Sequence, residues 1–251
     1  MSEQLRVAWI TGASTGIGYA TAHKLADDGW TVAVSARSQS DLERVADNHP
    51  LIVPFPMDVT VRQDVAETLN HIEDKLGVID LAIFSAGLWC PLEAKNFDTD
   101  AFEQSMKVNY LGVVEPLGLL IPQMIARRRG HLAWVSSVAG YRGLPQAAAY
   151  GPTKAALINL AECLKEDLEK YGVKISIINP GFVATPMTAK NEFPMPFIIT
   201  AERAAACIVE GIKKEKFEIA FPWQLVWPLK LARILPYRLF FWYVRNVISR
   251  S

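Results

Sequence analysis

The segment Val7-Ala8-Trp9-Ile10-Thr11-Gly12-Ala13-Ser14-Thr15-Gly16-Ile17-Gly18 decides the fold of this 251-residue chain. It begins with a continuous apolar run, and its glycine-rich part leads directly into a helical pattern. Glycines permit a tight turn and let the backbone approach a pyrophosphate at a helix N-terminus, where unpaired N–H groups attract anions. A lone glycine-rich loop is often only a turn. Between the first strand and the first helix of a βα pattern, however, it predicts a dinucleotide site, and the absence of a following Lys-Ser/Thr disfavours triphosphate chemistry.

Short apolar runs rich in β-branched residues recur along the rest of the chain. We expect seven strands, near 7–10, 31–35, 51–55, 81–85, 132–135, 175–178 and 217–220. Helical patterns lie between them, near 16–28, 41–47, 62–76, 99–128, 147–171 and 201–213. Alternating strands and helices form right-handed crossovers, and continuously apolar strands indicate a sheet that is covered on both faces. The pattern predicts an α/β, doubly wound Rossmann fold with a seven-stranded parallel sheet and helices on both faces.

Composition limits the class of protein. The chain is 51% hydrophobic and 21% charged, which excludes intrinsic disorder, and we find no uncharged apolar window near the ~20 residues that span a bilayer. The N-terminus leaves no room for a secretion signal. Three scattered cysteines favour neither disulfides nor a metal site, so we expect a cytoplasmic protein without metal. We expect a single domain over residues 1–220, followed by an extension over 221–251 that is rich in Pro and Trp.

The end of the second predicted strand indicates which dinucleotide is preferred. NAD-binding folds place Asp or Glu there to accept hydrogen bonds from the adenosine ribose, whereas this chain has Ser35-Ala36-Arg37. The Arg37 guanidinium can pair with a 2′-phosphate, so we expect NADP(H), with a solvated surface arginine as the alternative. Asp58, followed by Val59, could accept a hydrogen bond from the adenine amino group or cap the next helix.

A Tyr150-Gly151-Pro152-Thr153-Lys154 segment stands at the start of a long helical pattern. Side chains four residues apart on a helix share a face, and a nearby ammonium would lower the pKa of Tyr150 so that it can act as acid and base. Packing of both side chains is the alternative. Ser136 and Ser137 end the fifth strand at the sheet edge where α/β proteins bind ligands, and a hydroxyl there can stabilise an oxyanion.

Together these motifs resemble the short-chain dehydrogenase/reductase family over residues 5–220. The family's cofactor loop matches Gly12, Ser14, Thr15, Gly16, Ile17 and Gly18, and its Tyr-x-x-x-Lys pair matches Tyr150 and Lys154. Its catalytic serine falls on Ser137 rather than Ser136, and its catalytic asparagine falls on Asn109. Its Pro-Gly-x-x-x-Thr segment, which holds the nicotinamide carboxamide, matches Pro180, Gly181, Val183 and Thr185.

The resemblance implies that Ser137 orients a carbonyl, Tyr150 transfers the proton, Lys154 binds the nicotinamide ribose and Asn109 helps to hold a relay water. The family's usual Asn-Ala-Gly appears here as Ser85-Ala86-Gly87. We expect Ala86 and Gly87 still to allow close approach of the cofactor, and the missing amide to reduce stability rather than activity.

We therefore expect an NADP(H)-dependent enzyme that interconverts a carbonyl and an alcohol, homodimeric by resemblance and without nucleic-acid partners. The apolar stretches 140–149 and 187–199 favour a hydrophobic substrate, although a lid over the cofactor would have the same composition. The rival hypotheses are a non-catalytic NADP(H)-binding regulator and an isomerase or dehydratase on the same fold. The intact Ser137, Tyr150 and Lys154 set argues against the first, and the lack of a large C-terminal substrate domain argues against the second.

The extension 221–251 contains eight aromatic residues, five basic residues and no acidic residue. Residues 1–218 carry a net charge of −5 and the remainder +5. Amphipathic basic segments rich in Trp and Phe lie in bilayer interfaces, so the extension is a candidate for reversible membrane contact at the cell's inner surface. A subunit contact or a cover over the substrate cleft fits the composition equally well. We expect Pro222, Pro228 and Pro236 to divide the extension into short pieces that cannot cross a membrane.

Overall fold

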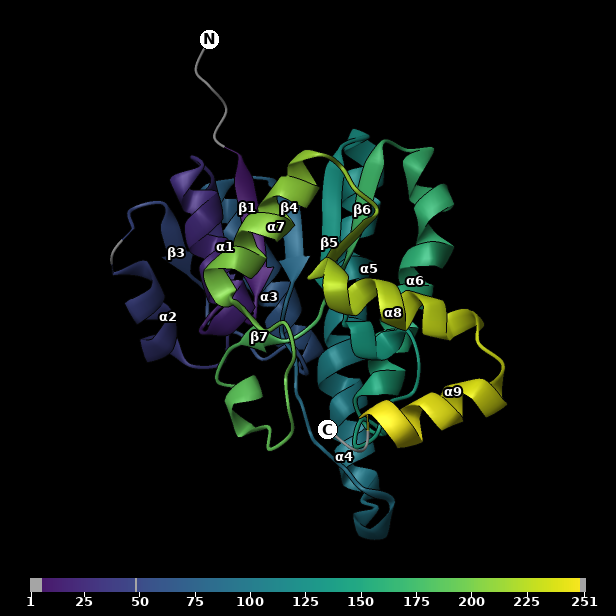
Figure 1. The fold of residues 1–251 in the computed structure, drawn as a ribbon. Coiled ribbons are helices and arrows are strands. Elements are labelled where there is room, and N and C mark those ends of the chain that lie inside the picture. Colours follow the sequence, from purple (N-terminus) through teal and green to yellow (C-terminus); the bar gives the residue numbers. More distant parts are fainter. Residues whose placement is uncertain (1–5, 48, 249–251) are drawn as a thin grey trace.

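The computed structural model describes residues 6–47 and 49–248, and its centre is a seven-stranded sheet (Figure 1). The strand order is β3-β2-β1-β4-β5-β6-β9 and all neighbours are parallel. This confirms the predicted α/β Rossmann-like sheet. The strands are β1 (Val7–Thr11), β2 (Thr31–Ser35), β3 (Ile52–Pro54), β4 (Ile79–Phe84), β5 (Gly130–Val135), β6 (Val173–Pro180) and β9 (Glu218–Phe221).

Helices cover both faces of this sheet. One apolar cluster joins the strands to α1 (Gly16–Asp27), α2 (Gln39–Ala46) and α7 (Ala201–Lys213). The other joins them to α3 (Arg62–Leu76), α5 (Gly112–Arg127) and α6 (Gly151–Glu169). Trp9 belongs to the second cluster and its neighbour Ile10 to the first, because successive side chains of a strand point to opposite faces. Both faces are apolar for this reason.

The helix predicted near 99–128 has an irregular centre. It consists of α4 (Thr99–Met106), a π-helical turn at Lys107–Leu111, and α5. By length and composition alone, Thr99–Arg127 could cross a membrane, which our composition analysis did not anticipate. Its side chains Val113, Leu117, Leu120 and Met124 are buried in the core, as expected for the central helix of a folded domain.

The carboxyl ends of the strands carry the connections that later form the site. After β1 the chain turns to β2 on one side, whereas β4 lies on the other side, so β1 and β4 flank the point where the strand order reverses. Open α/β sheets bind ligands at this point. After β6, β7 (Val183–Ala184) pairs with β8 (Ile199–Thr200), and the chain between them contains a 3₁₀ turn at Thr188–Lys190.

The C-terminal extension forms two further helices that fold back on each other (Figure 1). They are α8 (Trp223–Ile234) and α9 (Tyr237–Tyr243), followed by a π-helical turn at Val244–Ile248. The predicted break at Pro228 is wrong, because Pro228 lies inside α8. Pro222 and Pro236 precede the two helices as expected. Arg250, one of the five basic residues of the extension, lies outside the described residues.

Contacts at the start of β9 fasten this extension to the domain. Glu218 accepts hydrogen bonds from the Tyr141 hydroxyl, from Asn179 Nδ2 (2.9 Å) and from the Lys230 ammonium. Burial would raise the pKa of Glu218, but the hydrogen bonds from Lys230, Tyr141 and Asn179 lower it overall. Glu218 is therefore a charged anchor for α8.

Candidate active site

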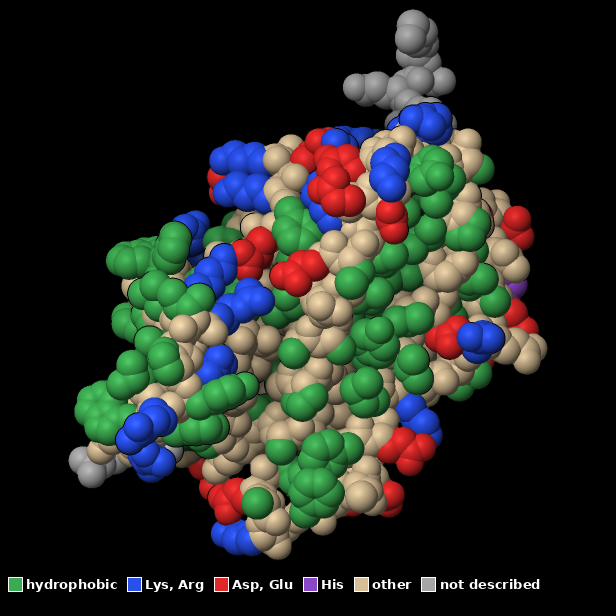
Figure 2. All heavy atoms as spheres, turned by 90° about the vertical axis from the view of Figure 1, so that its right-hand side faces the viewer, with side chains coloured by type: hydrophobic (Ala, Val, Ile, Leu, Met, Phe, Trp, Pro, Cys, Tyr) green, Lys and Arg blue, Asp and Glu red, His purple; other side chains and the backbone are tan. Residues whose placement is uncertain are grey.

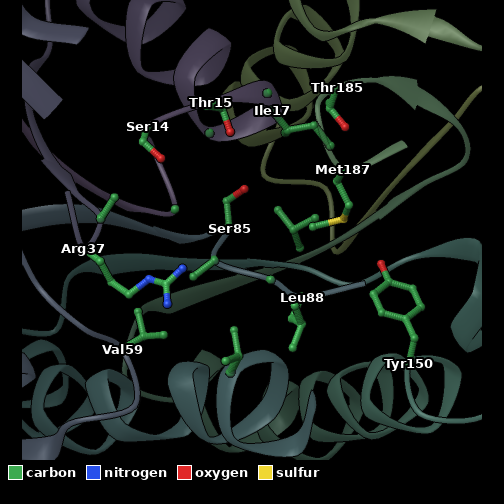
Figure 3. A pocket seen from close by; sticks show the side chains of 18 of the residues that line it. Ser14, Thr15, Ile17, Arg37, Val59, Ser85, Leu88, Tyr150, Thr185 and Met187 are labelled. Carbon is green, nitrogen blue, oxygen red and sulfur yellow. The ribbon is translucent and has the colours of Figure 1, made fainter. Parts of the chain in front are cut away.

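A single cavity of about 1290 Å³ runs along the carboxyl ends of the strands (Figure 3). It exceeds the roughly 300–1,000 Å³ of typical small-ligand pockets, so it has room for an extended ligand. The structure brings every residue that we predicted to contact the cofactor into its wall: Gly12, Ser14, Thr15, Gly16, Ile17, Gly18, Arg37, Asp58, Val59, Ser85, Ala86, Gly87, Tyr150, Lys154, Pro180, Gly181, Val183 and Thr185. Ser137 lines it as well, whereas Asn109 does not.

The glycine loop packs so closely that side chains are excluded from it. Gly12 has a φ of +66°, and a Cβ at this position would lie 2.5 Å from the Ala86 nitrogen. A Cβ on Gly18 would lie 2.4 Å from the Gly12 oxygen. The N-terminus of α1 has no acidic residue in its first turn and no side-chain cap, so its N–H groups remain available to an anion.

Arg37 and Asp58 lie at the other end of the cavity, beyond β2 and β3. Arg37 is exposed, and within the described chain it forms no ion pair; Figure 3 shows its guanidinium directed into the cavity. Asp58 accepts hydrogen bonds from the Thr60 N–H (2.9 Å) and hydroxyl (2.7 Å). Burial opposes its charge, yet these bonds and Arg37 lower the pKa of Asp58 overall. Asp58 thus orders a turn and does not cap α3, whose N-cap is Val61.

Asp41 also lines this end of the cavity, and sequence reasoning missed it. It lies in the first turn of α2, where Ser38 caps the helix, and its carboxylate pairs with Arg44. The signal that could have found it is its position four residues after Arg37, at the start of the helix that follows β2. Arg44 offsets the negative charge that Asp41 brings close to Arg37.

The two serines at the end of β5 have different environments. The Ser136 hydroxyl is fully buried and donates to the Lys154 carbonyl oxygen (2.7 Å). Ser137 accepts from the Ala139 N–H (3.1 Å) and interacts with the Tyr150 phenol. Ser137 is therefore the serine available to a ligand, as the resemblance implied.

Tyr150 and Lys154 meet at the N-terminus of α6, which begins at Gly151 rather than at residue 147 as predicted. Figure 3 shows the Tyr150 hydroxyl directed into the cavity. Lys154 is buried, its Nζ donates to the Val135 carbonyl oxygen (2.8 Å), and it lies 5.3 Å from the centre of the Tyr150 ring. The two side chains share one face, as their spacing predicts.

The predicted lowering of the Tyr150 pKa is wrong. Burial raises the pKa of Tyr150 to about 12, and the interaction with Ser137 opposes this rise only in part. Burial also lowers the pKa of Lys154 to about 7. Desolvation disfavours the charged form of each group. The phenol is therefore protonated at neutral pH.

Asn109 lies in the π-helical turn and is fully buried. Its Nδ2 donates to the Leu88 carbonyl oxygen (3.0 Å) and to the Thr153 hydroxyl (3.1 Å), while its Oδ1 accepts from the Leu88 N–H (2.6 Å). These bonds leave one lone pair of Oδ1 for the relay water that we expected. Asn109 thus connects the chain after β4 to α6. Turns of π-helix occur frequently at functional sites.

The Ser85-Ala86-Gly87 segment lacks the asparagine side chain of the family's Asn-Ala-Gly. Its own backbone N–H groups bind Thr11 of β1 instead. Ser85 N–H donates to the Thr11 carbonyl oxygen (3.2 Å) and Ala86 N–H to the Thr11 hydroxyl (3.4 Å). Figure 3 shows the Ser85 hydroxyl directed toward the cavity. A Cβ on Gly87 would lie at ordinary contact distance, 3.8 Å, from Lys154 Nζ, so the close approach of the cofactor at Gly87 stays a prediction.

Apolar side chains surround the end of the cavity next to Tyr150. Leu88 and Met187 line it, and the Trp89 ring meets the Tyr150 ring edge to face at 5.0 Å. Trp89 Nε1 donates to Asn191 Oδ1 (2.9 Å), which connects the 187–199 stretch through Trp89 to Tyr150. Sequence reasoning predicted the apolar 187–199 stretch but missed Leu88 and Trp89. Their position directly after Gly87 was the available signal.

The residues present fit a nicotinamide dinucleotide. A cradle without side chains faces a helix N-terminus at one wall, a guanidinium extends from another, and a lysine and a tyrosine converge where the nicotinamide ring would lie. The cavity is continuous across these groups. Across residues 6–47 and 49–248 no group of three or more His, Cys, Asp or Glu side chains could hold a metal ion.

Comparisons with known proteins agree with this geometry. A family model described as short chain dehydrogenase matches residues 6–194. An uncharacterized oxidoreductase of Myxococcus xanthus is 36% identical over 239 residues, which cover 94% of each chain.

Solved structures show the same fold. A short chain dehydrogenase/reductase from Burkholderia phymatum, in complex with NAD, superposes with a TM-score of 0.82 at 23% identity and covers 92% of this chain and 94% of its own. A ribose-5-phosphate isomerase from Brucella melitensis gives a TM-score of 0.80 at 25% identity, covering 87% of this chain and 91% of its own. Similarity of fold at this level therefore extends over proteins with different names.

Proposed function

The chain belongs to the short-chain dehydrogenase/reductase family of oxidoreductases, and on that premise we propose that it interconverts a carbonyl and an alcohol on a small hydrophobic substrate with NADP(H). The observation that carries this proposal is the convergence of Ser137, Tyr150 and Lys154 at one end of the glycine-lined cavity. A protein that only bound the cofactor would need neither a buried lysine beside a tyrosine nor a free serine hydroxyl.

In the proposed reduction Ser137 donates a hydrogen bond to the carbonyl oxygen of the substrate. Tyr150 is protonated at neutral pH, as any phenol with an ordinary pKa is, and burial raises its pKa further to about 12. It gives its proton to that oxygen as negative charge develops there. The bound cofactor supplies the hydride that the carbonyl carbon receives. Lys154, whose Nζ the Val135 carbonyl holds in place, binds the nicotinamide ribose and stabilises the phenolate left by proton transfer. Oxidation of an alcohol uses the same residues in reverse.

Arg37 supports the choice of NADP(H) over NAD(H). Its guanidinium faces the cavity without an ion pair among the described residues, and Arg44 neutralises the Asp41 carboxylate that also lines this end. A 2′-phosphate would therefore meet one unpaired positive charge. A hydrophobic substrate is supported by Leu88, Trp89 and Met187 around the Tyr150 end of the cavity.

Titration of the purified protein with NADPH and NADH tests the cofactor. NADPH should bind more tightly, and Arg37→Ala should weaken NADPH by about 1.5–3 kcal/mol, the scale of a charge-assisted hydrogen bond, while NADH changes little. Arg62→Ala, which removes an exposed arginine outside the cavity, is the control and should leave both affinities unchanged. Equal losses for the two cofactors in the Arg37 variant would reject the proposed role.

A panel of hydrophobic ketones, aldehydes and alcohols, followed by cofactor absorbance, tests turnover. Oxidation or reduction of the cofactor by at least one member is the expected result. Tight binding of NADPH without turnover on the whole panel would favour the non-catalytic regulator instead.

A further inference from the structure

The two C-terminal helices leave an apolar surface uncovered. On α8, Trp223, Trp227, Leu231 and Ile234 follow one another at intervals of four, four and three residues, so they share one side of the helix. Trp223 is 69% exposed and Trp227 is 62% exposed. Solvent exposure of two indoles on one helix is costly, because each could remove a large apolar area from water. This side of α8 is therefore not packed against the core of the domain.

The same surface continues on α9. Tyr237 and Phe241 stack with their ring centres 6.0 Å apart, and Leu239 and Trp242 are exposed on another side of this short helix. Figure 2 shows hydrophobic side chains, with Lys and Arg among them, gathered at the left of the molecule. We name this surface the apolar face and define it by Trp223, Trp227, Leu231, Ile234, Tyr237, Leu239, Phe241 and Trp242.

The basic residues of the extension divide into two groups. Lys230 pairs with Glu218, and the Arg233 guanidinium lies 5.7 Å from the centre of the Tyr141 ring, so both hold α8 on the domain. Arg238 and Arg245 are exposed beside the apolar face, and neither forms an ion pair within the described part of the chain. They are the cations available to a partner.

We propose that the apolar face docks on the surface of an anionic lipid bilayer, with Arg238 and Arg245 at the level of the headgroups. Aromatic and aliphatic side chains partition into the interface, and each cation near anionic headgroups adds to the binding. The chain has no acidic side chain after Glu218, and Glu218 is already held by Lys230, so no side chain of α8 or α9 repels anionic lipid.

Charge also favours a bilayer over a second copy of the chain as the partner of the apolar face. A two-fold interface would place this surface against itself, which would bring Arg238 and Arg245 of both copies together without an acidic partner. Helix length sets the mode of binding. The 12 residues of α8 extend about 18 Å, well short of the ~30 Å hydrocarbon core, so the helices lie along the surface and do not cross it.

Sedimentation of the full-length protein with vesicles tests the proposal. The protein should sediment with phosphatidylcholine vesicles that contain phosphatidylglycerol, less so as salt rises, and poorly with phosphatidylcholine alone. Trp223→Ser, Trp227→Ser and Trp242→Ser together should lower the bound fraction at least about tenfold. Arg238→Gln with Arg245→Gln should lower the partition coefficient roughly 10- to 30-fold, from about 1 kcal/mol for each cation.

Two controls match these variants. Tyr171→Ser removes an aromatic ring that is exposed at the end of α6, outside the extension, and Arg44→Gln with Arg62→Gln removes two exposed arginines of the N-terminal half. Both should bind vesicles like the parent. All substituted side chains are exposed, and circular dichroism checks that each variant is folded.

The proposal is overturned if the parent remains in the supernatant with anionic vesicles at low salt. It is also overturned if the tryptophan and arginine variants of the extension bind vesicles as well as their controls. A different pair of results would assign the apolar face to a second copy of the chain. In that case the parent stays in the supernatant, and light scattering finds a dimer for the parent but a monomer for the tryptophan variant.

Discussion

The cavity and the C-terminal helices use their side chains in opposite ways. Around the cavity several buried polar groups have fixed partners: Ser136 binds the Lys154 carbonyl, Lys154 binds the Val135 carbonyl, and Asn109, behind the cavity wall, holds Leu88. On α8 and α9 the exposed indoles of Trp223, Trp227 and Trp242 have no hydrogen-bond or ring partner among the described residues, and the inner sides of the helices are packed. A site for a rigid ligand is built by fixing groups in advance, whereas a surface for a fluid partner needs only exposure and charge.

The largest effect should come from the chemistry of the cavity. Tyr150→Phe removes the proton donor and keeps the ring that packs against Trp89, so turnover should fall by at least about 100-fold, the usual scale for loss of a general acid. The measurement is the rate of cofactor oxidation on any accepted substrate, with NADPH affinity as the control, which should survive. A near-normal rate would show that a different group carries the proton.

A smaller effect should come from the backbone cradle. Gly18→Ala would place a Cβ 2.4 Å from the Gly12 oxygen, so the glycine loop must shift, and we expect NADPH affinity to fall at least about tenfold, or about 1.4 kcal/mol. Overpacking should also reduce the free energy of unfolding by about 1–3 kcal/mol.

Gly118→Ala is the matched control for this substitution. Gly118 lies inside α5 with no atom within 4 Å of the added Cβ, so alanine should stabilise the protein by about 0.4–1 kcal/mol and leave cofactor affinity unchanged. If Gly18→Ala behaved like Gly118→Ala in fluorescence titration and urea unfolding, the loop would not be the rigid cradle described above.

The smallest effect should come from the anchor of the extension. Tyr141→Phe removes one of the three hydrogen bonds to Glu218, which should reduce the free energy of unfolding by about 1 kcal/mol and leave kcat close to that of the parent. Tyr171→Phe, at an exposed tyrosine, is the control and should change neither quantity. A large loss of kcat in the Tyr141 variant would show that the extension and the cavity are coupled, against the separation of the two regions drawn here.

Sequence alone predicted the sheet and the composition of the cavity wall, because both depend on local patterns. Carboxyl ends of parallel strands meet at one edge, so motifs directly after β1, β2, β4, β5 and β6 must lie together once the strands are recognised. Trp89 and Asp41 were missed because neither belongs to a recognised motif. Both follow motif residues closely in the sequence, but only the packing of the folded chain shows that they reach the site.

The protonation of Tyr150 could not be read from spacing. Its distance from Lys154 follows from the helix, but the pKa depends on how much water the folded chain excludes from both groups. The same limit applies to the extension. Five cations could be counted, but their division into anchors such as Lys230 and free charges such as Arg238 depends on Glu218, Tyr141 and the path of α8.

The π turn at Lys107–Leu111 keeps a long helix in phase with the sheet. The buried positions Ala101, Ser105, Asn109, Val113 and Leu117 are four residues apart, and on a regular α-helix each step would turn them about 40° further from the core, or about 160° over the run. One additional residue in the wide turn takes back about 100°. The turn thus allows a single helix to present Asn109 to Leu88 and Thr153 and to present Leu117 to the core. Deletion of one residue from the π turn would therefore rotate either Asn109 or Leu117 away from its buried position.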